Sequence, residues 1–242
     1  MIMKLPVLID DPRFYDDKIL TSEEILAWFD VYEAVWVHDA NNPKAPHAEL
    51  TSGKCSNGFF DCMRVLRNSK LCEIFGFQLA MKLKEAGATK VDWVIGSPYA
   101  AITFSHEVAK AFGAIHAFPE KDAFPEKDPF LPAEKKMIWH RMQIPKNAVV
   151  LQIEELITTS GTFKEVRRAV KLDNEEPVNW LPIIGTLIHR PPKLPVDYDG
   201  IEIVSLIEKE IWAVDQKDCP LCAIGSPRYR PKTNWLKLTG KA

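Results

Sequence analysis

The sequence lacks the features that mark membrane, secreted and nucleic-acid-binding proteins. No apolar run among its 242 residues is long enough to cross a membrane. Its first residues, MIMKLPVLIDDPRF, lack the apolar core of a signal peptide. The 31 Lys and Arg residues nearly balance 33 Asp and Glu residues, so charge gives no reason to expect a nucleic-acid partner. Five cysteines, an odd number, indicate reduced thiols. We therefore expect a cytoplasmic protein that contacts neither membranes nor nucleic acids.

The chain also lacks a Pro/Ser-rich linker that would divide it into separate domains. Patterns typical of strands and helices alternate from residue 59 to about 190, which predicts an α/β fold with a parallel sheet and crossover helices. Helices are expected over 20–31, 68–86 and 101–112, and strands over 91–95 and 115–118. We expect an amino-terminal extension with an added segment over 1–65, an α/β core over 66–190, and a carboxyl-terminal strand and cysteine-containing tail over 191–242.

The most informative stretch is VVLQIEELITTSGT, residues 149–162. Its apolar start predicts a buried strand, and Glu154 and Glu155 are expected at the strand's carboxyl end. A turn of small hydroxyl residues and one glycine follows, and then a helical pattern begins. Ligands of open α/β sheets bind at the carboxyl ends of strands, and the amino terminus of a helix there favours a phosphate.

Carboxylates repel phosphates, so the pair and the turn suit a ligand with two chemical faces. A phosphorylated sugar is such a ligand, because its hydroxyls can donate to the carboxylates while its phosphate occupies the turn. A divalent cation such as Mg²⁺ could also bind between carboxylates, hydroxyls and a second phosphate group.

This fourteen-residue pattern resembles the ribose-phosphate signature of the type I phosphoribosyltransferases. The resemblance implies that Glu154 and Glu155 hold the ribose hydroxyls of phosphoribosyl pyrophosphate. It implies that the 5′-phosphate is bound by the turn, that is by Thr158, Thr159, Ser160, Gly161 and Thr162. Glu155 departs from the family, whose second acid is usually aspartate.

Three further stretches resemble the bacterial orotate phosphoribosyltransferases. GSPYAAI, residues 96–102, resembles the family's pyrophosphate loop, with alanines where glycines are usual; it implies pyrophosphate binding by Ser97, Pro98, Tyr99 and Ala100. LTSGKCSNGFFDC, residues 50–62, resembles the base-binding segment and implies contacts from Lys54, Phe59 and Phe60. WLPIIGTLIHR, residues 180–190, ends in Arg190, whose planar fork matches a carboxylate and which the resemblance assigns to the base.

Residues 118–132, FPEKDAFPEKDPFLP, contain the sequence FPEKD twice. Four prolines and six charges predict an exposed loop, which is either a tolerated insertion or a lid over the ligand. The resemblance places a catalytic lysine here, and the duplication leaves Lys121 and Lys127 as candidates.

The tail contains CPLC, Cys219 to Cys222, which supplies half of a structural zinc site. Cys55, Cys62 and Cys72 have no matching spacing, and a similar tail recurs in bacterial orotate enzymes, so no resident metal ligands are assigned.

The resemblance, which runs from about residue 20 to 230, implies a five-stranded parallel sheet flanked by helices, with a hood over the base. It also implies a homodimer, Mg²⁺ bound through pyrophosphate, and conversion of orotate and phosphoribosyl pyrophosphate to orotidine 5′-phosphate and pyrophosphate. Two alternatives remain open: transfer to a different base, and a non-catalytic protein that binds ribose phosphates on the same scaffold.

Overall fold

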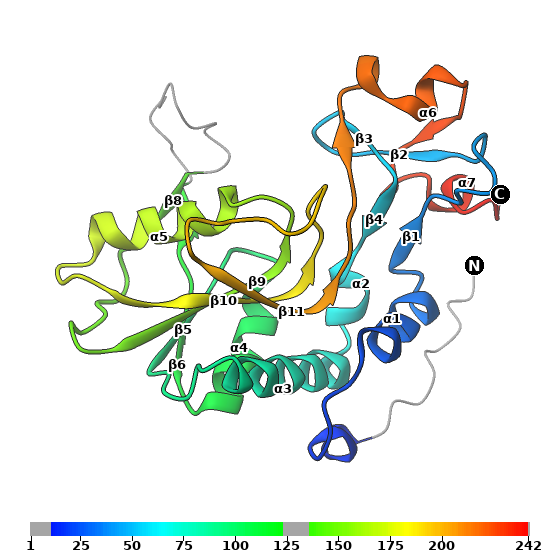
Figure 1. The fold of residues 1–242 in the computed structure, drawn as a ribbon. Coiled ribbons are helices and arrows are strands. Elements are labelled where there is room, and N and C mark those ends of the chain that lie inside the picture. The colour runs from blue at the N-terminus through cyan, green and yellow to red at the C-terminus, as the bar shows by residue number, and fades with distance from the viewer. Residues whose placement is uncertain (1–10, 123–135, 242) are drawn as a thin grey trace.

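The computed structural model describes residues 11–122 and 136–241, and its main feature is one parallel sheet of five strands (Figure 1). The strands lie in the order β11-β10-β9-β5-β6, and every neighbouring pair is parallel. Their bounds are β5 Trp93–Gly96, β6 Ile115–Ala117, β9 Val149–Ile157, β10 Asn179–His189 and β11 Glu202–Glu208. The expected fold class is thereby confirmed.

The strand order has a consequence for binding. The first strand along the chain, β5, lies between β6 and β9, so the direction of winding reverses between β5 and β9. In open α/β sheets, ligands bind at such a switch point, beyond the carboxyl ends of the strands. The segments that leave these two ends are residues 97–101 and 158–160.

Helices cover both faces of this sheet (Figure 1). On one face lie α3 Ser69–Glu85 and α4 Ile102–Phe112, and on the other lies α5 Gly161–Asp173. The helix expected over 68–86 is α3, and its apolar side is buried throughout, at Leu71, Ile74, Phe75, Leu79 and Leu83. This helix packs so closely on β10 that a Cβ at Gly185 would lie 2.9 Å from Leu83 Cδ1, so a larger residue there would force that side chain to shift.

The amino-terminal region packs beside this core. The 3₁₀ helix η1 spans Pro12–Tyr15 and α1 spans Ser22–Val31, and Thr21 caps α1 by accepting from the amide of Glu24. Buried Gln78 of α3 anchors the connection between them: it accepts from the amide of Leu20 at 2.6 Å and donates to the carbonyls of Tyr15 and Lys18.

A smaller part of the chain, here called the hood, combines segments from both ends of the sequence. Its four-stranded sheet has the order β12-β3-β2-β13, from β2 His47–Glu49, β3 Cys55–Ser56, β12 Ala213–Val214 and β13 Arg228–Tyr229. Figure 1 shows the early segments and the late ones interleaved there. The hood also contains the pair β1 Val35–Val37 and β4 Gly58–Phe60, and the helices α2 Cys62–Leu66, η3 Gln216–Asp218, α6 Pro220–Ala223 and α7 Trp235–Leu238.

The remaining strands are short: β7 Glu120–Lys121 pairs with β8 Met137–Ile138. The second FPEKD copy, with Lys127, lies outside the described residues, so the lid hypothesis stays a prediction. So do the expected boundaries near residues 65 and 190. No helix in the described ranges is both long and apolar enough to span a bilayer.

Candidate active site

A cavity of about 380 Å³ lies between the hood and the carboxyl ends of β9 and β10. The sheet side contributes Ala100, Glu155, Leu156 and Arg190. The hood side contributes Leu50, Thr51, Ser52, Phe59, Phe60, Asp61, Cys62, Met63 and Lys232. Residues predicted separately for base, ribose and pyrophosphate therefore line one cavity, next to the switch point of the sheet.

Arg190 is the most unusual residue of this cavity. It follows β10 directly, and its amide donates to the carbonyl of Ile157 at 2.8 Å, which ties the end of β10 to the end of β9. Within the described ranges, the guanidinium atoms Nε and Nη1 are buried and have no hydrogen-bond partner. Burial lowers the pKa of the guanidinium. A buried cation with unpaired donors has a strong preference for an anionic ligand.

Two phenylalanines from β4 form an apolar wall opposite the sheet. Phe60 is almost fully buried and meets Phe29 edge to face at 5.8 Å. Phe59 is half-buried and contacts Trp235 of α7, with ring centroids 6.5 Å apart. Because their neighbours hold both rings in place, the cavity combines a fixed apolar wall with the guanidinium of Arg190. This combination suits a flat heterocycle that carries an acidic group.

The acidic pair lies within β9, not after it as the sequence suggests. The strand continues to Ile157 because Glu154 stays in register with Thr186 of β10. Neighbouring residues of a strand point to opposite faces, so the two carboxylates have different surroundings. Glu155 lines the cavity, whereas Glu154 is not among its lining residues.

Glu154 is buried and accepts a short hydrogen bond from the hydroxyl of Ser97, and another from Gln152 Nε2 at 3.2 Å. Burial is the main reason that the pKa of Glu154 rises to about 8, and the neighbouring Glu155 adds to the rise. The carboxyl group thus connects β9 to the segment that leaves β5. Glu154 lies on the same side of β9 as Gln152, whose Oε1 accepts from Arg167 Nε of α5 at 3.0 Å.

The hydroxyl-rich turn is open to solvent. Thr159, Gly161 and Thr162 are exposed, and Ser160 caps α5 without a side-chain hydrogen bond to the helix. The amide of Lys164 is the first to bond within the helix, at 3.0 Å to the carbonyl of Ser160. The preceding amides of the first turn therefore face outward as donors, at the positive end of the helix dipole. This is the anion-binding geometry that the turn predicts.

The predicted pyrophosphate segment, residues 97–100, lies beside the same edge. Ser97 is buried against Glu154, whereas Tyr99 is 62% exposed and follows a cis peptide bond after Pro98. Lys121 Nζ lies 4.9 Å from the centre of the Tyr99 ring. The positive charge of Lys121 also lowers the pKa of Glu155, against the larger effect of burial, which raises it. Lys121 therefore lies close to both the pyrophosphate segment and the cavity.

Sequence reasoning misplaced one residue and missed several. Lys54 is exposed and does not line the cavity; its carbonyl closes the turn by accepting from the amide of Leu50 at 2.8 Å. Thr51 and Ser52 of that turn line the cavity instead. Lys232 was also missed, although the alternating basic residues Arg228, Arg230 and Lys232 were a visible signal.

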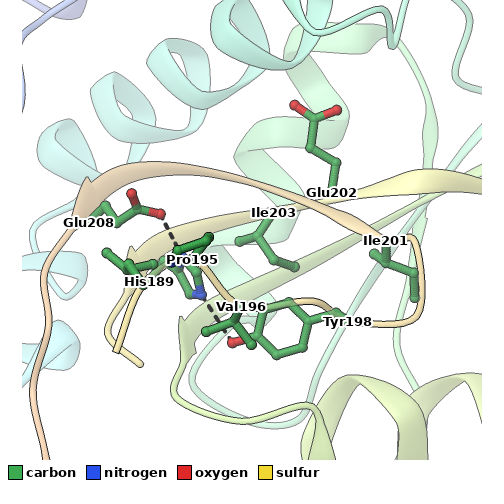
Figure 2. Close-up of a pocket in the computed structure, with 9 residues that line it drawn as sticks. His189, Pro195, Val196, Tyr198, Ile201, Glu202, Ile203 and Glu208 are labelled. Atoms are coloured by element: carbon green, nitrogen blue, oxygen red, sulfur yellow. Dashed lines mark hydrogen bonds and ion pairs between the residues drawn. The ribbon is translucent and has the colours of Figure 1, made fainter. Parts of the chain in front are cut away.

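A second cavity of about 400 Å³ lies at the other side of β10, near β11 (Figure 2). Three of its polar side chains pair with one another: His189 Nδ1 lies 2.8 Å from Glu208 Oε2, and His189 Nε2 lies 3.0 Å from the hydroxyl of Tyr198. The fourth, Glu202, is an exposed carboxylate. The rest of its lining in Figure 2 is largely apolar, including Pro195, Val196 and Ile203. With no unpaired buried donor, this cavity does not match the predicted ligand.

Comparison with known proteins connects this geometry to one family. No family model matches the chain. The curated orotate phosphoribosyltransferase of Thermoanaerobacter sp. is 30% identical over 186 residues, which cover 76% of this chain and 87% of the relative. That of Caldanaerobacter subterraneus is 29% identical over 191 residues, covering 78% and 90%.

Among solved structures, UMP synthase of Leishmania donovani matches with a TM-score of 0.53 and 16% identity. The match covers 80% of this chain and 37% of that longer chain, and it supports the fold alone. The sequence relatives support more than the fold, because the matched region covers 90% and 87% of their own length. The chain belongs to the orotate phosphoribosyltransferase family.

Proposed function

We propose that the protein transfers the phosphoribosyl group of phosphoribosyl pyrophosphate to orotate, giving orotidine 5′-phosphate and pyrophosphate. The observation that carries this proposal is Arg190, whose buried Nε and Nη1 have no partner in the described part of the chain. Orotate is a flat ring with a carboxylate, and it would supply the missing acceptor while its ring packs on the wall of Phe59 and Phe60.

The remaining groups fit the second substrate. The open amino terminus of α5, with Thr159 and Thr162, would hold the 5′-phosphate. Glu155 lines the cavity and would accept from ribose hydroxyls. Glu154, hydrogen-bonded to Ser97, would position the pyrophosphate segment and the ribose together. This divides the work of the acidic pair between a carboxylate in the cavity and one beneath the neighbouring loop.

In this reaction the bond from the ribose to pyrophosphate breaks as the base attacks, so negative charge grows on the leaving group. Lys121 lies beside Tyr99 of the pyrophosphate segment, and its ammonium would stabilise that charge. Lys121 is thus the described candidate for the catalytic cation, and Lys127 stays a prediction from the sequence.

Mg²⁺ fits the donor set of this edge. Hard oxygen atoms from Ser97, Glu154 and Glu155 lie near the pyrophosphate segment, and Mg²⁺ typically uses one or two carboxylates together with substrate phosphates. When bound, the ion would neutralise part of the pyrophosphate charge. We also propose a homodimer. A reducing compartment such as the cytoplasm agrees with the five cysteines, which are all free thiols.

The direct test is a turnover screen with phosphoribosyl pyrophosphate, Mg²⁺ and one base at a time: orotate, uracil, adenine or hypoxanthine. We expect pyrophosphate release with orotate and at least a hundredfold less with uracil, which lacks the carboxylate. Faster turnover of another base would replace orotate in the proposal. Tight calorimetric binding of phosphoribosyl pyrophosphate without turnover of any base would instead indicate a non-catalytic binder.

A further inference from the structure

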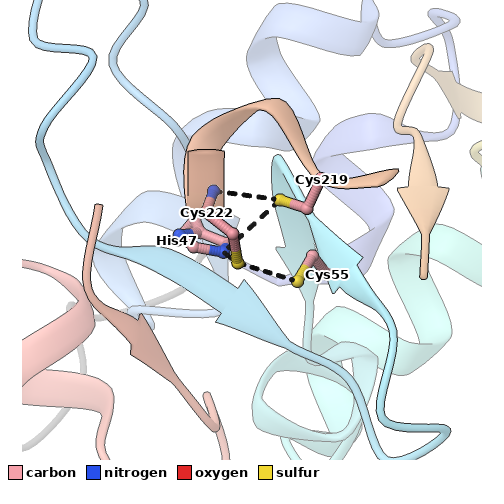
Figure 3. Close-up of side chains that lie close together, drawn as sticks. All are labelled: His47, Cys55, Cys219 and Cys222. Carbon is pink, nitrogen blue, oxygen red and sulfur yellow. Dashed lines mark hydrogen bonds between the residues drawn. The ribbon is translucent and has the colours of Figure 1, made fainter. Parts of the chain in front are cut away.

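Four side chains that the proposed reaction does not use meet inside the hood (Figure 3). His47 comes from β2, Cys55 from β3, and Cys219 and Cys222 from the start and the body of α6. Their candidate ligand atoms, one nitrogen and three sulfurs, all lie within 4.8 Å of one another. Three of the four side chains are buried, and Cys222 is partly exposed. Residues 167 to 175 positions apart in sequence thus lie within contact distance.

The spacing of these atoms matches the edges of a tetrahedron around zinc. Zinc binds sulfur at about 2.3 Å and imidazole nitrogen at about 2.0–2.1 Å, so a tetrahedral site requires sulfur–sulfur distances near 3.8 Å and sulfur–nitrogen distances near 3.6 Å. The observed distances are 3.6 Å between Cys55 Sγ and Cys222 Sγ, and 3.6 and 3.3 Å from His47 Nε2 to Cys219 Sγ and Cys222 Sγ. Three of the six separations thus lie close to those that a bound ion would impose, and all six are within 4.8 Å.

The hydrogen bonds of His47 orient its ring so that Nε2 faces the cysteine sulfurs. Ser226 Oγ donates its single proton to the carbonyl of Ala45 at 2.6 Å. It must therefore accept from His47 Nδ1, which lies 2.8 Å away. With its proton on Nδ1, a neutral His47 presents the lone pair of Nε2 to the three cysteines. A ligating histidine typically donates its other N–H in this way, which fixes the ring and its tautomer.

The surrounding charges and donors also suit a metal-bound form. Three thiolates and one Zn²⁺ sum to a charge of −1. Arg228 Nη1 lies 3.9 Å from Cys55 Sγ and supplies a compensating positive charge. The amide of Cys222 donates to Cys219 Sγ at 3.4 Å, which stabilises a sulfur that carries negative charge. Cys219 and Cys222 also line a surface cavity, which gives an ion a path to the site.

We propose that His47, Cys55, Cys219 and Cys222 form a structural Zn²⁺ site that joins the two ends of the chain within the hood. Four protein ligands complete the tetrahedron and leave no open position, so the site is structural and not catalytic. Its position links it to the candidate active-site cavity, because Cys55 lies three residues after Ser52 of the lining turn. The inference does not depend on the proposed reaction, since metal content is measured without substrate.

The test is zinc quantification by mass spectrometry on full-length protein expressed with added zinc and purified under reducing conditions without chelators. We expect about one zinc per chain in the wild type and in Cys72→Ser, a matched control that changes a buried thiol of α3 outside the cluster. In Cys219→Ser and Cys222→Ser we expect at least a tenfold lower zinc content after dialysis against a weak chelator.

A second measurement avoids dependence on how well the variants fold. Wild-type protein stripped of metal and refilled with Co²⁺ should show the strong visible absorption of tetrahedral cobalt together with thiolate-to-cobalt charge transfer, and Cys72→Ser should show the same spectrum. Wild-type protein that holds less than a tenth of an equivalent of zinc, and that gives no tetrahedral cobalt spectrum, would overturn the proposal. The proposal would also be overturned if Cys55 and Cys222 were found joined by a disulfide in protein that had been purified under reducing conditions.

Discussion

Replacing Arg190 with methionine should separate activity from stability, because the guanidinium is buried without the partners that it needs. Arg190→Met retains an unbranched apolar stem of similar reach and removes the two orphaned donors Nε and Nη1. If orotate accepts both donors, the substitution removes two charge-assisted hydrogen bonds of about 1.5–3 kcal/mol each. Since 1.4 kcal/mol corresponds to a factor of ten, kcat/KM for orotate should fall by roughly 10²–10⁴.

In contrast to the activity, the thermal stability of the ligand-free protein should not fall in Arg190→Met. A buried donor without a partner costs about 1–3 kcal/mol, and the methionine has no such donor. For a chain of this size 1 kcal/mol shifts the Tm by about 2–4 °C, so the Tm of Arg190→Met should be unchanged or a few degrees higher. Most substitutions at a buried site lower stability, which makes this result diagnostic.

The assay combines steady-state kinetics with orotate and uracil and thermal unfolding without ligand. Arg13→Met, on the exposed helix η1, is the matched control and should leave both measurements unchanged. The discrimination between orotate and uracil should also collapse in Arg190→Met, because uracil has no carboxylate to lose. A change in kcat/KM below about threefold would refute the role of Arg190, and a large loss of Tm would show that its donors are satisfied in the free protein.

Three further predictions concern the other parts of the site. Burial raises the pKa of Glu154 from 4.5 to about 8, so the folded state binds a proton that the unfolded state has released; the contribution of Glu154 to the stability of the ligand-free protein should be fully present below pH 4.5 and be lost as the pH rises towards 8, by up to about 1.4 kcal/mol per pH unit. Glu154→Gln should flatten this dependence in thermal unfolding, and an equally steep curve in the variant would contradict the assignment. Thr159→Glu places a negative charge at the open amino terminus of α5, which favours the helix but repels a phosphate; KM for phosphoribosyl pyrophosphate should rise at least tenfold with no loss of Tm, whereas Thr89→Glu, in an exposed turn after α3, should change neither. Lys121→Ala should lower kcat by about 10²-fold and KM by much less, because its charge acts on the leaving group; the exposed Lys90→Ala is the control, and equal, minor losses in both variants would remove Lys121 from the mechanism.

Local sequence patterns predicted the sheet and its helices well, because these elements depend on local chemistry. The cap at Thr21, the apolar side of α3 and the strand–turn–helix order of residues 149–162 each follow from residue types a few positions apart. The position predicted for the end of β9 was wrong, because two adjacent charged residues suggested that the strand stops before them. Pairing with β10 over Thr186 to His189 keeps Glu154 and Glu155 in the sheet instead.

What the sequence could not supply was proximity between distant segments. Arg190 was predicted to bind a carboxylate, yet its lack of protein partners appears only once the hood and sheet are assembled. The cluster in the hood is a similar case. The pair Cys219–Cys222 was visible, but His47 and Cys55 lie on strands β2 and β3, and only the mixed hood sheet brings them to that pair.

The interleaved hood sheet also sets an order of events during synthesis. Strands β2 and β3 emerge early from the ribosome, but their neighbours β13 and β12 are made only after every strand of the main sheet has been translated. The main sheet can therefore assemble on the nascent chain while β2 and β3 have only each other as neighbours in the hood sheet. Lys232 of the cavity lining and Trp235, which contacts Phe59 of the apolar wall, are made last, so a chain that stops before residue 213 lacks part of the cavity and of its support.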